Sequence, residues 1–260
     1  MTFETIVTSQ TADIITVSLN RPDVHNAMNE QLMVELTQCF QQLSTNSSIR
    51  CIILTGNGKS FCAGADLNWM KSMISYTKEE NIKDSRLLLD LYETINSCPK
   101  PVIGKINGHA FGGGLGLIAV CDVTMTIPGR KFAFSEANLG IIPSVISTFV
   151  APRMKPADMR RFFITAERFD SEIAKQIGLI DQIVQPDEFD QAIQQTCDRI
   201  KSSGPQAIAE SKNLISRLQT LDRSAYTEFT VEKIAELRIS HEGQEGITAF
   251  LEKRKPNWSE

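Results

Sequence analysis

Residues 101–127, with the sequence PVIGKINGHAFGGGLGLIAVCDVTMTI, decide the fold that we expect for this chain. The two ends of this stretch, PVIGKI and DVTMTI, are short apolar runs that are typical of buried strands. Between them, three consecutive glycines at 112–114 precede an apolar segment that predicts a short helix. Two strands separated by a glycine-rich turn and a helix indicate a layered α/β core.

The same alternation extends on both sides of this stretch. Toward the N-terminus the pattern predicts a hairpin of strands at 5–9 and 14–19, a helix over 28–43 with Asn26 as its N-cap, a strand over 51–55 and a helix over 81–96. Beyond Pro143 it predicts mainly helices, at 157–165, 171–177, 188–203, 205–221 and 225–240, with one strand-like segment at 179–184. We therefore expect a core over residues 1–200 and a helical region over residues 201–260.

Composition narrows the class of protein. The 260 residues include 27 Lys and Arg against 31 Asp and Glu, a net charge of −4, which argues against a polycationic nucleic-acid binder. The longest uncharged windows, 106–121 and 137–152, are shorter than the roughly 20 residues of a membrane-spanning helix, and the N-terminus has no targeting pattern. The six cysteines form no C-x-x-C pair and the three histidines lie far apart, so neither a disulfide framework nor a metal site is expected. These features predict a cytoplasmic protein that acts on small molecules.

Two segments rich in small residues are candidates for ligand contact through the backbone. In SFCAGADL, residues 60–67, small side chains leave backbone N–H groups open to a ligand, and in GHAFGGGLG, residues 108–116, the glycines precede a helix. Neither segment has the spacing of a dinucleotide site or the Gly-Lys-Ser/Thr of a phosphate loop, which disfavours hydride transfer and nucleotide hydrolysis. Close helix–strand packing is the alternative explanation for the glycines.

Glu136 is the best acid–base candidate in the sequence. It is the only charged residue in an apolar neighbourhood of more than ten residues, so burial should raise its pKa toward neutrality. The alternatives are an exposed glutamate at a strand end or a helix-capping carboxylate. No G-x-S-x-G elbow is present, and Cys62 is expected to be a structural thiol rather than a nucleophile.

Six motifs in register resemble the crotonase (enoyl-CoA hydratase/isomerase) superfamily, and the likeness runs from about residue 6 to residue 258. They are LNRPDVHNAM at 19–28, FCAGADL at 61–67, KPVIGKING at 100–108, GGG at 112–114 with CD at 121–122, EANLG at 136–140 and FLEKRK at 250–255. The resemblance implies an α/β spiral of ββα units with a C-terminal helical trimerisation region, and such trimers often pair into hexamers. It also implies a coenzyme A thioester as substrate, with no separate cofactor because coenzyme A is part of the substrate.

The resemblance carries specific site residues with it. The N–H groups of Ala65 and Gly113 would form an oxyanion hole for the enolate of the thioester, where each donor is worth about 3 kcal/mol, and Glu136 would transfer the proton. Phe250 and Lys253 would lie near the nucleotide end of coenzyme A bound to a neighbouring subunit. The remaining contacts to coenzyme A would come from Asp23, Val24, Asn26, Ala63, Ala65, Asp66, Leu67 and Gly113.

The departure from the superfamily pattern is at Gly116. Hydratases of this superfamily usually carry a glutamate there, and a single glutamate at the position of Glu136 is the arrangement of Δ3,Δ2-enoyl-CoA isomerases. In contrast, residues 135–147 and 160–169 look like bacterial methylglutaconyl-CoA or carboxygeranoyl-CoA hydratases, which act in leucine or acyclic terpenoid breakdown. We expect a hydratase of a branched 2-enoyl-CoA, acting in leucine, terpenoid or fatty-acid breakdown. A one-glutamate isomerase and a non-catalytic acyl-CoA binder are the alternatives, and the acyl chain, the stereochemistry and the choice between trimer and hexamer stay open.

Overall fold

Two sheets form the centre of the computed structural model, which describes residues 3–259. The larger sheet has the order β1-β2-β3-β5-β7-β10 and the smaller one the order β4-β6-β8-β9. The larger sheet consists of β1 (Ile6–Thr11), β2 (Ile14–Leu19), β3 (Cys51–Gly56), β5 (Val102–Ile106), β7 (Val123–Thr126) and β10 (Gln182–Ile183). The smaller sheet consists of β4 (Ser60–Cys62), β6 (His109–Phe111), β8 (Lys131–Ala133) and β9 (Phe169–Asp170).

The chain passes through both sheets in a repeating order. β3 in the larger sheet is followed by β4 in the smaller one, and β5 by β6 and β7 by β8 in the same way. The pairs β3–β5, β5–β7, β4–β6 and β6–β8 are all parallel, and parallel strands need a crossover connection between them. Each turn therefore adds one strand to each sheet before a helical segment. This confirms the predicted α/β spiral of ββα units.

The helices account for most of the remaining chain. They are η1 (Pro22–Val24), α1 (Glu30–Thr45), α2 (Leu67–Met73), α3 (Lys78–Asn96), α4 (Gly113–Ala119), η2 (Glu136–Leu139), α5 (Ser144–Val150), α6 (Pro156–Thr165), α7 (Ser171–Gln176), α8 (Phe189–Lys201), α9 (Pro205–Thr220), α10 (Arg223–Ile239), α11 (His241–Leu251) and η3 (Asn257–Ser259). The predicted helices at 28–43 and 81–96 correspond to α1 and α3. α3 begins earlier than predicted because Thr77 and Glu80 form a capping box.

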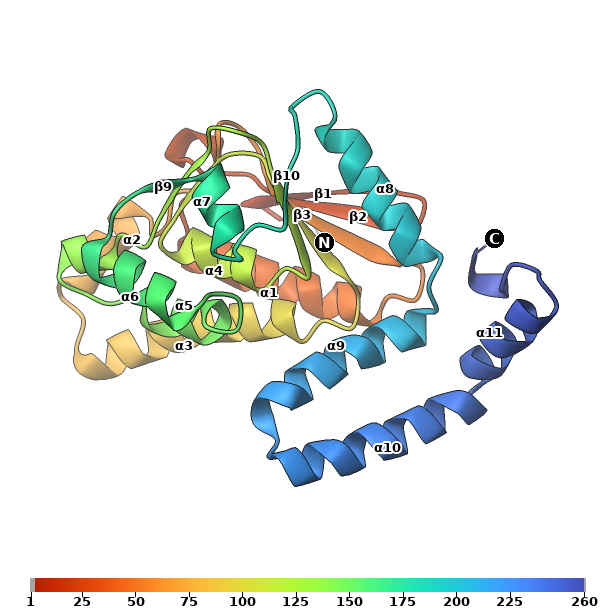
Figure 1. Cartoon of the computed structure of the whole chain (residues 1–260). Helices are drawn as coiled ribbons and strands as arrows, with labels where there is room; N and C mark the ends of the chain where they lie inside the picture. The colour runs from red at the N-terminus through yellow and green to blue at the C-terminus, as the bar shows by residue number, and fades with distance from the viewer. Residues whose placement is uncertain (1–2, 260) are drawn as a thin grey trace.

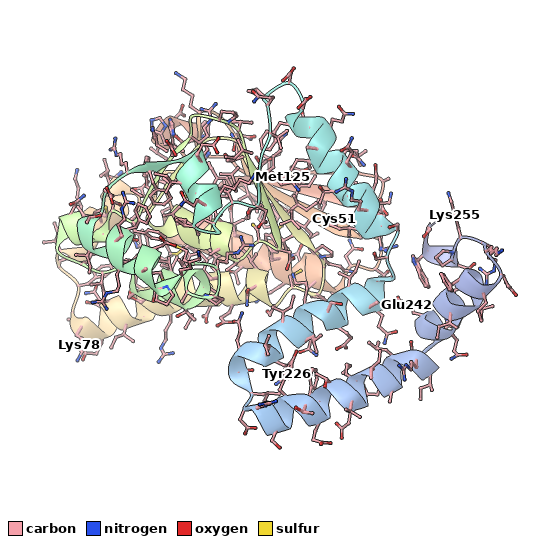
Figure 2. The ribbon with its side chains drawn as sticks, in the orientation of Figure 1. Cys51, Lys78, Met125, Tyr226, Glu242 and Lys255 are labelled. Atoms are coloured by element: carbon pink, nitrogen blue, oxygen red, sulfur yellow. The ribbon has the colours of Figure 1, made fainter. Side chains whose placement is uncertain are left out.

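Alternating residues of the larger sheet bury two separate apolar clusters. Ile15, Ile52 and Val102 belong to the main core, which also contains the apolar faces of α1, α3 and α4. Their sequence neighbours Ile14, Cys51 and Ile103 belong to a second cluster with Phe189, Ile193 and Cys197 of α8. Because successive strand residues point to opposite faces, α8 covers one face of the sheet, and α1, α3 and α4 lie on the side of the opposite face. Cys51 and Met125, both in the second cluster, are labelled in Figure 2.

The predicted N-cap of the first long helix is wrong. α1 begins at Glu30, and its cap is Asn29, whose Oδ1 accepts a hydrogen bond of 3.0 Å from the N–H of Leu32. Asn26 is instead fully buried, with a left-handed φ of 56°, and its Nδ2 donates to the carbonyl oxygens of Asn57 and Ser60. Asn26 therefore fixes the loop before the helix, which is the second common use of an asparagine that tolerates a left-handed backbone.

Helices α9, α10 and α11 form an arm that extends away from the two sheets (Figure 1). The arm is attached to the core by an ion pair of 2.6 Å between Lys212 and Asp122, and by the Arg50 guanidinium, which donates to the carbonyl oxygens of Ser203 and Trp258. Within the arm, the Glu242 carboxylate accepts hydrogen bonds of 2.8 Å from the N–H groups of Gln206 and Ala207 at the start of α9. The arm is thus fixed by polar contacts.

All six cysteines are buried free thiols, as the sequence predicts. Among the helices of residues 3–259, none combines the length and the apolar character that crossing a lipid bilayer requires. Over the same described range, no three of the His, Cys, Asp and Glu side chains lie close enough to hold a metal ion.

Candidate active site

The N–H group of Ala65 is open at the end of the segment that follows β4. Ala65 forms a parallel bridge with Met28, in which Met28 donates to the carbonyl oxygen of Gly64 at 2.7 Å and receives a hydrogen bond of 2.8 Å from Asp66. Because the N–H groups of successive residues point in opposite directions along an extended chain, the N–H of Ala65 points away from Met28. It donates to no acceptor within residues 3–259, and Ala65 is exposed.

The N–H group of Gly113 is open at the start of α4. It has no acceptor among the described residues, and Gly113 is partly accessible. The preceding residue, Gly112, has φ 49° and ψ −122°, a backbone conformation that only glycine adopts without strain. Gly112 thus allows the chain to turn sharply into the first residue of α4.

These two open amides belong to segments that touch each other. A Cβ placed on Gly64 would lie 3.0 Å from the carbonyl oxygen of Phe111 and 3.9 Å from Cα of Gly112. In addition, a Cβ on Gly113 would overlap Cε of Met28, the residue that is paired with Ala65. The structure therefore brings Ala65 and Gly113, which are far apart in the sequence, to adjacent loops.

Glu136 lies beside the same glycines. Its Oε1 would be 3.3 Å from a Cβ placed on Gly112, and its Oε2 is buried with no hydrogen-bond partner within residues 3–259. Burial, opposed only by a hydrogen bond from the residue's own N–H, raises the pKa of the carboxyl. A buried polar atom without a partner in the free protein is suited to a ligand or a proton transfer. This environment matches the one expected from the sequence.

The position of Gly116 is occupied by neighbouring side chains. A Cβ on Gly116 would lie 2.5 Å from Cζ and 2.7 Å from Oη of Tyr92, and 2.8 Å from Cγ2 of Ile146. Tyr92 comes from α3 and Ile146 from α5, and both are buried. A side chain at residue 116 therefore has no room, and Glu136 has no second carboxylate beside it at this position.

An ion pair and a helix cap hold the segment that carries Ala65. Asp66 accepts a hydrogen bond of 2.8 Å from Arg21 Nη2, and its other oxygen accepts from the N–H groups of Asn68 and Trp69 at the start of α2. Burial alone would raise the pKa of Asp66, but these hydrogen bonds hold it below its usual value. The Asp66 side chain is thus occupied, and so is its backbone, because the N–H donates to the carbonyl oxygen of Met28 and the carbonyl oxygen accepts from the N–H of Met70. Asp66 therefore holds the segment in place and leaves the N–H of Ala65 as the open group.

Most of the other residues predicted to contact coenzyme A lie near this segment. The N–H of Ala63 donates to the carbonyl oxygen of His25 at 3.0 Å, which joins the loop of Asp23 and Val24 to the loop of Ala65. Leu67, at the start of α2, is 75% exposed. Asn26 is buried, so its contribution is to shape this loop.

Phe250 and Lys253 lie elsewhere. Phe250 belongs to α11 and Lys253 follows it, on the arm and away from α2 and α4 (Figure 1). Both side chains are exposed, Phe250 to 83%. Within one chain, the structure does not bring these two residues to the loops of Ala65 and Gly113, and their role toward a neighbouring subunit stays a prediction.

Met28 and Tyr92 line the start of α4, and the sequence predicts no site role for either. The one available signal is that Tyr92 stands on the apolar face of a predicted helix with Leu88, Leu91 and Ile95, where a buried hydroxyl needs a partner. Cys62, in contrast, fits its prediction, because burial raises the pKa of its thiol to about 12. It is therefore a poor nucleophile.

Comparison with known proteins identifies the family. Residues 9–260 match the family model described as enoyl-CoA hydratase/isomerase. The chain is 30% identical to a crotonyl-CoA hydratase from Syntrophomonas wolfei, with 99% of each chain covered. The crystal structure of an enoyl-CoA hydratase from Shewanella pealeana is 37% identical, with a TM-score of 0.94 over 98% of this chain and 96% of that one. Pseudomonas aeruginosa AtuE is 29% identical, with the same TM-score over 99% and 100%.

The chain belongs to the enoyl-CoA hydratase/isomerase family, within the crotonase superfamily. It is therefore an enzyme, and its fold, including the helical C-terminal region, matches crotonase structures. The resemblance inferred from the six sequence motifs is confirmed at this level.

Proposed function

We propose that this enzyme adds water to a branched 2-enoyl-CoA thioester, with the N–H groups of Ala65 and Gly113 as the oxyanion hole and Glu136 as the proton-transfer residue. The observation that carries the proposal is the juxtaposition of two open amides on touching loops with one buried carboxyl whose Oε2 has no partner within residues 3–259. Relatives named crotonyl-CoA hydratase and short-chain-enoyl-CoA hydratase, each 30% identical, favour hydration as the reaction.

The proposed reaction uses one carboxyl. Water attacks Cβ of the conjugated thioester, and the charge that develops on the thioester oxygen is stabilised by the two amides. Protonated Glu136 then gives its proton to Cα, and the proton lost by the attacking water returns to the Glu136 carboxylate. The raised pKa of Glu136 supports this role, because it increases the protonated fraction near neutral pH.

The segment after Pro143 supports a branched acyl chain. Residues 144–147 begin α5, and Ile146 reaches Gly116 beside Tyr92. Bulky apolar groups here reshape the end of the acyl pocket, in line with the resemblance to methylglutaconyl-CoA and carboxygeranoyl-CoA hydratases. On this basis we propose a role in leucine or acyclic terpenoid breakdown. A cytoplasmic location and contacts from Asp23, Val24 and Leu67 to coenzyme A stay predictions.

A second candidate function is Δ3,Δ2-enoyl-CoA isomerisation. It is favoured by the filled space at Gly116, which leaves Glu136 without a second carboxylate to hold water. In this reaction the Glu136 carboxylate removes a proton from one carbon of the enoyl chain and returns it two carbons away, with the same oxyanion hole.

The direction of the pH dependence separates the two reactions. Hydration requires protonated Glu136, so kcat/KM falls as the pH rises above the pKa of this carboxyl. Isomerisation requires the carboxylate, so kcat/KM falls as the pH drops below it. Loss of the conjugated thioester absorbance from a 2-enoyl-CoA such as 3-methylglutaconyl-CoA measures the first reaction, and its gain from a 3-enoyl-CoA measures the second.

The substitution Glu136→Gln tests the catalytic assignment. We expect kcat to fall by about 10²- to 10⁴-fold with substrate binding retained, because the amide cannot transfer the proton. Glu228→Gln, on the exposed face of α10, is the matched control and should keep full activity. Undiminished turnover by Glu136→Gln would refute the proposal, and thioester binding without turnover by the wild type would support a non-catalytic binder instead.

A further inference from the structure

Tyr92 lies on the buried face of α3, and its hydroxyl reaches the first residue of α4. The side chain is fully buried, and Oη donates a hydrogen bond of 2.7 Å to the carbonyl oxygen of Gly113. That is its one hydrogen bond within residues 3–259. Gly113 is also the residue whose N–H is open. The Tyr92 hydroxyl therefore holds the carbonyl oxygen of Gly113, the residue whose N–H is one of the two open amides.

Three neighbours fix the position of the Tyr92 ring. Cβ atoms placed on Gly113 and Gly116 would lie 3.1 Å and 2.7 Å from Oη, so a side chain at 116 would displace the hydroxyl and one at 113 would crowd it. On another side, the ring meets Phe149 of α5 edge-on, with centroids 5.5 Å apart. The Tyr92 hydroxyl thus lies against α4, and its ring packs on α5.

The hydroxyl also keeps its proton. Burial, together with the nearby Cys62 and Glu136, raises the pKa of Tyr92 well above its ordinary value. Tyr92 is thus a neutral donor at any pH at which Glu136 titrates. Its hydrogen bond to Gly113 stays in place through the proton transfers at the carboxyl.

We propose that Tyr92 is a positioning residue for the reaction: it holds the first turn of α4 so that the Gly113 N–H faces the thioester oxygen. This inference rests on the proposed oxyanion hole. In an oxyanion hole, a small displacement of a hydrogen-bond donor lowers the reaction rate even though the donor is still present. Without the Tyr92 hydrogen bond, the Gly113 peptide has more freedom and the enolate is less well stabilised.

The substitution Tyr92→Phe removes the hydroxyl and keeps the ring. We expect kcat to fall about tenfold, less than for the loss of a whole oxyanion donor, while KM changes less than twofold. The pH at which activity changes should stay that of the wild type, because Tyr92 carries no transferred proton. Tyr226→Phe is the matched control, since Tyr226 lies on α10 in the arm (Figure 2) and should leave kcat unchanged.

A purely structural role for Tyr92 predicts a different result. In that case the melting temperature falls, but kcat per folded molecule stays within twofold of the wild type, and this outcome overturns the inference. A shifted pH profile in Tyr92→Phe also overturns it, because it makes Tyr92 a proton carrier.

Binding of acetoacetyl-CoA provides a readout that does not need turnover. This thioester is enolisable, and its bound enolate is detected by its ultraviolet absorbance. We expect Tyr92→Phe to form less enolate and to bind about tenfold more weakly than the wild type. Equal binding by both proteins overturns the role of Tyr92. Weaker binding by the variant, with no turnover of any enoyl-CoA by the wild type, supports Tyr92 while the proposed function fails. Absence of binding to the wild type overturns both.

Discussion

Helix α4 and the arm formed by α9, α10 and α11 differ in how far their apolar side chains are buried. From Gly114 to Ala119, every residue of α4 is buried. By contrast, α9 and α10 contain no buried residue, although both carry a stripe of large apolar side chains. Contacts within the chain thus determine the position of α4 in full. The arm is left with an apolar surface that its own chain does not cover.

The uncovered surface supports the predicted oligomer. The exposed apolar residues of the arm are Ile215, Leu218, Val231, Ile234, Ile239, Ile247, Phe250 and Leu251. A row of such residues along several helices marks an interaction surface rather than ordinary surface variation. We therefore propose that the arm packs on other copies of the chain in a homotrimer, or in a hexamer made of two trimers. On this proposal, the contacts that α4 makes within the chain are made by the arm between chains.

The largest effect is expected for Gly116→Glu in α4. The new side chain meets Tyr92 and Ile146 within 2.8 Å of its Cβ, and its carboxyl would be buried without a partner. We expect the free energy of unfolding to fall by about 3 kcal/mol or more, measured by denaturant unfolding. The double substitution with Tyr92→Ser makes room and should recover part of this loss. Wild-type stability of Gly116→Glu alone would show that the packing around α4 is looser than described.

An intermediate effect is expected for Leu218→Glu in the arm, where the side chain is 61% exposed. Stability of the isolated fold should change by less than about 0.5 kcal/mol, because no contact within the chain is lost. The assembly should dissociate, since a charge is placed in the proposed interface, and sedimentation will measure the change in mass. Gln219→Glu, which adds the same charge at the next residue, is the control. An unchanged mass of Leu218→Glu would exclude this helix from the interface.

The smallest effect is expected for the pH dependence of the free energy of unfolding that is due to Glu136. Because burial raises its pKa in the folded state, the wild type loses stability as the pH rises from the ordinary value of 4.5 through the raised value. Glu136→Gln does not titrate, so it should be more stable than the wild type at neutral pH. This advantage should shrink as the pH falls toward 4.5. Melting temperatures of both proteins between pH 4 and 8 provide the test, and a constant difference would mean that the carboxyl is solvated.

Much of the fold could be predicted from local patterns. The hairpin of β1 and β2, the strands β3, β5 and β7, and helices α1 and α3 follow from periodicity, with errors of a few residues at their ends. The error at the start of α1 arose because Asn26 and Asn29 are both suited to capping. The side-chain amide of Asn26 donates instead to the carbonyl oxygens of Asn57 and Ser60, which are more than 30 residues away in the sequence. These distant contacts leave Asn29 as the cap.

The candidate site could be predicted only in part. Glu136 stands out because it is the one charge in a long apolar stretch, and the structure places its carboxyl in the buried environment that this pattern indicates. The site roles of Ala65 and Gly113 could be predicted only because their motifs resemble those of the crotonase superfamily. Tyr92 gave no comparable signal, because a tyrosine on the apolar face of a helix usually serves packing alone.

The sequence by itself determined the alternation of strands and helices, the glycines at 112–114 and the isolation of Glu136, because each depends on the properties of near neighbours in the chain. The tertiary structure alone decided that Tyr92 fills the space over Gly116, and that the loops of Ala65 and Gly113 touch. Tyr92 and Gly113 are 21 residues apart, and Met28 and Ala65 are further apart still. Such contacts depend on how separate elements pack, which periodicity along one segment does not encode.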